Sequence, residues 1–144
     1  SMSGASGTAG DYAYGVIFDA LVTGHTGVAI TGTTSAATGN AYGIQANRAI
    51  STTGIGDITL QGTVGSASAS IGVYLNVGFG AIATTNGAIS VSGAGSASEQ
   101  DVYASAVLTS GGTGNILFQA DSLSLNATVN AGANTATRPA RAGT

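Results

Sequence analysis

Short stretches in which apolar and polar residues alternate recur along the chain. The first is GVIFD at residues 15–19, and it returns as GIQAN at 43–47, GVYLN at 72–76 and DVYAS at 101–105. The stretches are spaced by 28, 29 and 29 residues. Alternation with a period of two over four to six residues predicts a strand with one buried face.

A second alternating block follows each of these stretches. It reads GVAITG at 27–32, GDITLQG at 56–62, GAISVSG at 87–93 and GNILFQA at 114–120. β-Branched residues and glycines are dense, and no apolar stripe has the 3.6-residue period of a helix. A fixed period of 20 to 50 residues is typical of stacked repeats. The pattern therefore predicts an all-β fold, a right-handed parallel β-helix (β-solenoid) of about four coils of 28–29 residues.

Equivalent positions in successive repeats should stack into columns along such a solenoid. One internal column is predicted to contain Val16, Ile44, Val73 and Val102. A second internal column is predicted to contain Val22, Ile50, Phe79 and Leu108.

Two further columns are candidates for contacts at the surface. A polar column directly follows the first block of each repeat and consists of Asp19, Asn47, Asn76 and Ser105. We interpret this column as structural, because such side chains can form hydrogen bonds with the turns of the coils above and below. Tyr74 and Tyr103 share one outward position, which Ile17 and Gln45 occupy in the earlier repeats. Such a pair is either a cross-strand contact or an exposed aromatic contact for sugar rings or a protein partner.

The repeats divide the chain into three parts. Residues 1–10 are expected to be an expression remnant and flexible lead-in, residues 11–131 the β-solenoid repeats, and residues 132–144 a C-terminal tail. The alternating segment LSLNATV at 123–129 is expected to begin a fifth, incomplete turn.

The composition narrows the classes of function. Only 6% of the residues are charged and 43% are hydrophobic, the net charge is −3, and neither Lys nor Cys occurs. These values exclude a basic nucleic-acid surface, a polybasic membrane surface, disulfides and thiolate metal sites. There is also no run of about 18 apolar residues for membrane insertion.

The chain offers little for catalysis. Its single histidine, His25, lies in the turn TGHTG at 23–27, and no GxSxG elbow places a nucleophilic serine. β-Helical polysaccharide-degrading enzymes use clustered carboxylates and basic residues along one groove. Asp57 and Asp101 are candidates for one face, but the equivalent positions of other repeats are Gly, Ala or Asn and no basic residue accompanies them. We therefore expect no enzyme activity, no catalytic residue, no cofactor and no metal.

The strand motif GxIxLxG and its recurrence, as in DITLQG at 57–62 and AISVSG at 88–93, resemble the β-helical repeats of large bacterial surface adhesins. Among these adhesins, the repeats are most similar to those of filamentous haemagglutinin-like exoproteins and autotransporter passengers. The resemblance covers residues 12–129 and implies a non-catalytic stalk or display segment, secreted and held at the bacterial cell surface. Its neighbours would be flanking repeats of the same exoprotein, and a host-cell or glycan receptor is left open.

Other functions fit the same residues. The first alternative is a self-assembling extracellular fibre or matrix subunit, which would associate end to end. A weaker alternative is an ice- or glycan-binding β-solenoid, because threonine-rich patches such as TGTT at 31–34 occur.

Overall fold

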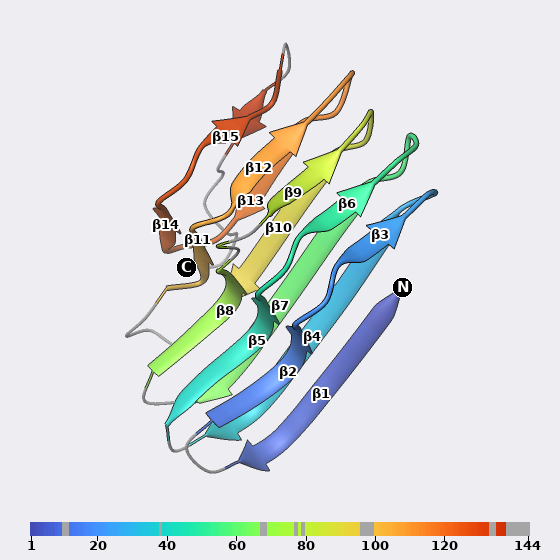
Figure 1. Ribbon diagram of the computed structural model, residues 1–144. Helices are drawn as coiled ribbons and strands as arrows, with labels where there is room; N and C mark the ends of the chain where they lie inside the picture. The colour runs from blue at the N-terminus through green and yellow to red at the C-terminus, as the bar shows by residue number, and fades with distance from the viewer. Residues whose placement is uncertain are drawn as a thin grey trace.

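The structure is a computed structural model, and it describes residues 1–9, 12–37, 39–66, 69–76, 78, 80–95, 100–132 and 135–137. All regular structure in this part of the chain is β-strand. The strands form three sheets that run side by side along one axis (Figure 1). Within the described residues there is no helix with the length and apolar character needed to cross a membrane.

Each sheet contains strands from successive repeats in chain order. Sheet A contains β1 (Met2–Ala9), β4 (Val28–Ala37), β7 (Ile58–Ser66), β10 (Ile89–Ala94), β13 (Ile116–Gln119) and β16 (Ala136–Thr137). Sheet B contains β2 (Tyr12–Phe18), β5 (Asn40–Ala46), β8 (Ala69–Leu75), β11 (Val102–Ala104) and β14 (Leu123–Leu125). Sheet C contains β3 (Val22–Gly24), β6 (Ile50–Thr52), β9 (Ala81–Thr84), β12 (Val107–Ser110) and β15 (Val129–Asn130).

Every coil passes through one strand of sheet B, one of sheet C and one of sheet A before it returns to sheet B. Neighbouring strands pair in parallel, for example β5 with β8 and β7 with β10. The predicted parallel β-helix is therefore confirmed. The expected fifth turn is also present, since β14, β15 and β16 pair with β11, β12 and β13.

The first predicted internal column is confirmed. Val16, Ile44, Val73 and Val102 are register partners in sheet B, and Leu123 extends the column into the fifth turn. The four predicted side chains are buried in the main core between the three sheets. They are joined there by the paired apolar residues of sheet A, such as Ile58 and Leu60.

The second predicted column is wrong at one position. Ile82, and not Phe79, is the register partner of Ile50, and Leu108 follows it. The cause is a longer corner in the third coil. Five residues separate Asn76 from Ile82, whereas two separate Asn47 from Ile50. Ile82 is completely buried, and Phe79 itself lies outside the described residues.

The ends of the chain also differ from expectation. The segment expected as a flexible lead-in contains β1, which pairs with β4 and places Met2 opposite Ile30 of the core. At the other end, β16 lies in the expected tail and pairs with β13. Both strands have too few large apolar residues to give an alternating signal in the sequence. The pairing partner, and not the local pattern, determines their conformation.

Sheets A and B lie in close backbone contact along a line of glycines, which we call the glycine seam. A Cβ added at Gly32 would collide with the carbonyl of Gly43, and one at Gly62 would collide with the carbonyl of Gly72. The members of the seam in the described residues are Gly4, Gly15, Gly32, Gly43, Gly62, Gly72 and Gly93. Only glycine lets two backbones approach this closely.

Beyond the seam the two sheets continue as a thin two-layered lobe with a small core of its own, formed by Ala13, Ala41 and Val64. The lobe becomes narrower toward the C-terminus (Figure 1). The strands of sheet A shorten from 10 residues in β4 to 9, 6, 4 and 2 in β7, β10, β13 and β16. The shortening coincides with the end of the seam, because Asp101 and Ala120 stand where earlier repeats have glycine.

Candidate functional site

The polar column lies at the corner where each coil leaves sheet B for sheet C. Asn47 donates from Nδ2 to Oδ1 of Asp19 at 2.8 Å, and Gln45 donates from Nε2 to Oδ1 of Asn47 at 3.0 Å. One pair further along, the Ser105 hydroxyl donates to Oδ1 of Asn76 at 3.4 Å. The four residues that the sequence singled out therefore stack along the solenoid axis.

The backbone fixes these side chains in place. Asn47 N donates to Phe18 O at 2.9 Å, and Asn76 N donates to Ala46 O at 3.0 Å, so each corner residue extends the pairing of sheet B by one step. Asn126 makes the same bond to Ala104 O at 2.8 Å. It is a fifth member that the sequence analysis missed, although LSLN at 123–126 repeats the VYLN of 73–76.

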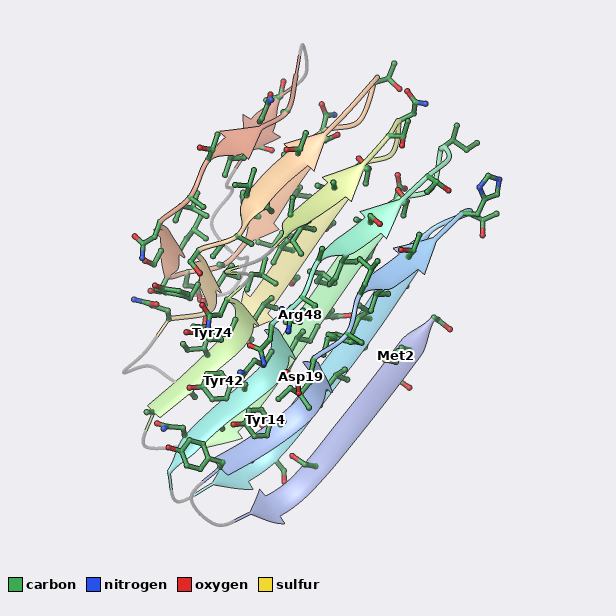
Figure 2. The ribbon with its side chains drawn as sticks, viewed as in Figure 1. Met2, Tyr14, Asp19, Tyr42, Arg48 and Tyr74 are labelled. Carbon is green, nitrogen blue, oxygen red and sulfur yellow. The ribbon has the colours of Figure 1, made fainter. Side chains whose placement is uncertain are left out.

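A shallow depression borders this column, lined by Asp19, Asn47, Arg48, Asn76 and Gly78. Arg48 donates from Nε to the backbone carbonyl of Asp19 at 3.4 Å, and Figure 2 shows both side chains on the outer surface. Asp19 supplies the only carboxylate of the column, and the other polar groups follow it at successive coils. The arrangement holds the corners of neighbouring coils together.

A ladder of tyrosines crosses the outer face of sheet B. Tyr74 and Tyr103 are register partners, with ring centroids 5.1 Å apart and planes inclined by 28°. Tyr14 and Tyr42 form a second registered pair at 5.5 Å and 9°. A diagonal contact of 5.4 Å between Tyr42 and Tyr74 joins the two pairs, and Figure 2 shows Tyr14, Tyr42 and Tyr74 in a row across β2, β5 and β8.

Only Tyr74 and Tyr103 of this ladder were predicted from the repeat, because they occupy one position within its first alternating block. Tyr14 and Tyr42 lie three residues earlier in their strands, and only the diagonal contact brings them into line. Partial burial raises the pKa of Tyr74 above its usual value, and the Tyr103 phenol adds to the shift.

A third column, which the sequence analysis did not identify, consists of buried hydroxyls at the turn from sheet C to sheet A. Thr52, Thr84 and Ser110 are buried register partners. The Thr52 hydroxyl donates to Gly56 O at 2.7 Å, and the Thr84 and Ser110 hydroxyls donate to Gly87 O. Each hydroxyl bonds a turn carbonyl, which offsets the cost of its burial.

Asp101 is the one buried carboxylate in the described part of the chain. Its Oδ1 accepts from Gly95 N at 2.6 Å, and its Oδ2 accepts from Asp121 N at 2.7 Å and Ser122 N at 3.2 Å. The carboxylate thus joins the third, fourth and fifth coils at the point where the lobe ends. In the described part of the chain, the partners of this carboxylate are backbone amides, which identifies Asp101 as a corner-closing residue.

His25 lies in an exposed turn, as the sequence predicted. Its Nδ1 is 3.2 Å from the Thr53 hydroxyl of the next coil. Within the described residues, no group of three or more His, Cys, Asp or Glu side chains is placed to hold a metal ion.

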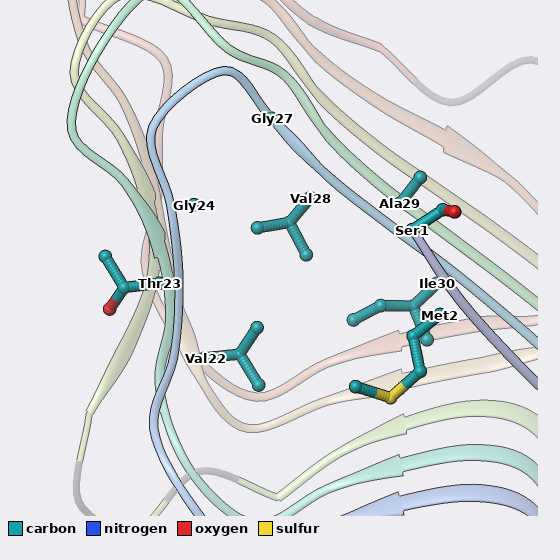
Figure 3. A pocket seen from close by; sticks show the side chains of 9 residues that line it. All are labelled: Ser1, Met2, Val22, Thr23, Gly24, Gly27, Val28, Ala29 and Ile30. Atoms are coloured by element: carbon teal, nitrogen blue, oxygen red, sulfur yellow. The ribbon is translucent and has the colours of Figure 1, made fainter.

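An apolar pocket of about 170 Å³ opens at the N-terminal end of the main core. Figure 3 shows Met2, Val22, Val28 and Ile30 around it. The pocket is the open N-terminal end of the solenoid core, where the first strand of each sheet has a neighbouring strand on one side only.

Comparisons with other proteins do not add to this description. No protein-family model matches the chain, and neither the curated proteins nor the solved structures gave a significant match.

Proposed function

We propose that the chain is a structural stalk or display segment of a secreted, adhesin-like bacterial exoprotein, and that it has no catalytic role. The observation that carries this proposal is the continuity of the columns. Apolar, polar and hydroxyl positions each repeat in register from coil to coil. A solenoid of this kind is quasi-one-dimensional, so its length follows directly from the number of coils.

The surface chemistry supports the same proposal. The outward side chains of sheet A are small and uncharged over much of their length, as in Thr31, Thr33 and Thr59. The polar groups of the corner column bond to one another between neighbouring coils. Such a surface suits a spacer that carries other domains away from a cell.

Removal of one coil in register tests the proposal. Deletion of residues 44–72 joins Gly43 to Val73, which is the register partner of Ile44. A stalk tolerates this deletion, so we expect cooperative urea unfolding and wild-type display of a C-terminal epitope tag on cells that secrete the chain through a surface anchor. The matched control deletes residues 44–57 and joins Gly43 of β5 to Ile58 of β7. A strand of sheet A then follows directly in the position of the second half of a sheet B strand, so the coil is out of register. We expect this control to lose both properties.

Two results would contradict the stalk proposal. One is loss of folding or display in the in-register deletion. The other is saturable binding of the intact chain to host cells or to a glycan array, since the proposal assigns recognition to other parts of the exoprotein.

A second candidate function is that of a self-assembling fibre or matrix subunit. The open strand edges favour it: β1, β2 and β3 are outermost at one end of the sheets, and β16, β14 and β15 at the other. Exposed edges recruit further strands unless Lys, Pro or bulges block them, and no Lys occurs in the chain. Its test is light scattering by the isolated chain over a dilution series.

A further inference from the structure

The tyrosine ladder contains two pairs whose members are held directly opposite each other by hydrogen-bonded strands. Tyr14 faces Tyr42 between β2 and β5, and Tyr74 faces Tyr103 between β8 and β11. Their ring centroids are 5.5 and 5.1 Å apart, and their planes are inclined by 9° and 28°. The sheet beneath the rings keeps each pair in contact.

The geometry points to these two pairs as sites of oxidative tyrosine cross-linking. In the presence of a one-electron oxidant of the haem peroxidase class with hydrogen peroxide, Tyr74 would become joined to Tyr103, and Tyr14 to Tyr42, by a carbon–carbon bond between the rings. The link between Tyr74 and Tyr103 would tie the third coil covalently to the fourth. This inference does not depend on the proposed stalk function.

Each phenol gives up one electron and one proton, which leaves a phenoxyl radical whose unpaired spin is shared with the ring carbons ortho to the oxygen. Two ortho carbons form the new bond, and the hydrogen displaced at each carbon moves to oxygen and restores the phenol. The protein loses two electrons and two protons, and these reduce one hydrogen peroxide, with its own two hydrogens, to two waters.

The two registered pairs differ from the other tyrosine contacts in that their members lie directly opposite each other on hydrogen-bonded strands. The ring centroids of Tyr74 and Tyr103 lie 5.1 Å apart with planes inclined by 28°, within the range of about 4.5–7 Å that is usual for interacting aromatic pairs. Tyr42 and Tyr74 contact diagonally, with planes at 46°. Tyr12 is 59% exposed and faces Asn40 across the strand pair, so no tyrosine lies opposite it.

The spacing of the aspartates permits a direct test. A protease that cuts before Asp cleaves the chain at residues 11, 19, 57, 101 and 121. Tyr14 and Tyr42 then lie in fragments 11–18 and 19–56, and Tyr74 and Tyr103 in fragments 57–100 and 101–120. After treatment of the full chain with haem peroxidase and hydrogen peroxide, we expect the monomer to yield both joined fragment pairs. Each should weigh two hydrogens less than the sum of its parts by mass spectrometry.

Three variants identify the residues that react. Tyr103→Phe keeps the ring stack but should abolish the joined pair 57–100/101–120, and Tyr14→Phe should abolish 11–18/19–56. Tyr12→Phe removes a tyrosine that shares fragment 11–18 with Tyr14, and it should leave both products unchanged. Urea unfolding of each variant checks that the sheet is intact.

Several outcomes would overturn the inference. These are joined fragments found only in covalent dimers, the same product pattern when the chain is oxidised after unfolding in urea, and a diagonal Tyr42–Tyr74 product as abundant as the registered ones. Retention of the 57–100/101–120 product in Tyr103→Phe would overturn it as well.

Discussion

At the scale of single residues, the core is a set of columns in which each side chain contacts its equivalents one coil away. The column Ile50, Ile82 and Leu108 has no exposed surface at any of these positions. Truncation of one side chain in the column therefore removes contacts with both neighbouring coils. The position of Ile82 is the most informative, because the third coil reaches it through a longer corner.

We expect Ile82→Ala to lower the free energy of unfolding by about 2–5 kcal/mol, the usual cost of deleting a buried aliphatic side chain. Ile55→Ala is the matched control, since Ile55 is 84% exposed in a turn and should change stability by less than about 0.5 kcal/mol. Equilibrium unfolding in urea measures both. If Ile82→Ala behaved like Ile55→Ala, the register assigned to β9 would be incorrect.

At the scale of elements, the corners decide how one strand passes to the next. Most corners use short polar side chains or glycines, whereas the fourth coil uses the buried carboxylate of Asp101. It replaces the lobe as the connection between sheets A and B, because three backbone amides from two segments converge on it. The carboxylate connects the residue after β10 with the residues before β14, in addition to the backbone bonds that the amides of Asp101 and Val102 donate to Ser122 O.

We expect Asp101→Ala to destabilise the protein by about 1.5–3 kcal/mol, the usual contribution of a hydrogen bond to a charged group. Asp57→Ala is the control, because Asp57 is exposed and accepts one amide, from Ala88 N at 2.7 Å. It should cause a smaller loss. Thermal unfolding of the two variants gives the comparison, and equal losses would show that Asp101 does not close the corner.

The elements also show what sequence periodicity can and cannot predict. The strands of residues 15–19 and their repeats were predictable, because alternating side chains and a constant spacing define both strand and register. The position of Ile82 was not, since an insertion in a corner shifts the register without changing the local pattern. The glycine seam and β1 were missed for another reason: small residues carry no periodic signal, and their role depends on the backbone opposite them.

The candidate sites also include residues that were predictable from the repeat and residues that were not. The polar column was predictable because its members occupy one position in each repeat. The tyrosine ladder was predicted only for Tyr74 and Tyr103, since the contact between Tyr42 and Tyr74 joins two different positions of the repeat. The role of the Asp101 carboxylate was not predictable, because its amide partners lie in the irregular corners before and after the fourth coil.

At the scale of the whole molecule, the two ends present complementary edges. Stacking of a second copy would place β14 of one molecule beside β2 of the next, and β15 beside β3, with the parallel order of each sheet preserved. Such a head-to-tail contact does not close on itself and leads to filaments. The pocket around Met2 and Val28 would be covered in this arrangement.

We expect the isolated chain to associate with increasing concentration, which light scattering over a dilution series measures. Thr23→Pro should reduce association. Val22 N already bonds inward to Ala49 O at 3.1 Å. Successive amides of a strand point to opposite sides, so the amide of Thr23 points away from β6, toward the unpaired edge of β3. Proline at this position has no N–H to donate to a strand of a second molecule. A wild-type chain that stays monomeric at every concentration would contradict the fibre alternative.

The narrowing of the lobe toward the C-terminus gives the molecule a weak end and a strong end. Each coil is stabilised by its neighbours alone, so the short strands β13 to β16 hold the chain by fewer hydrogen bonds than β4 and β7 do. A pulling force should therefore peel the chain from its C-terminal side, one coil after another. Amide hydrogen exchange should follow the same order, with protection decreasing from β7 to β16, and uniform protection along the axis would show that the coils open together.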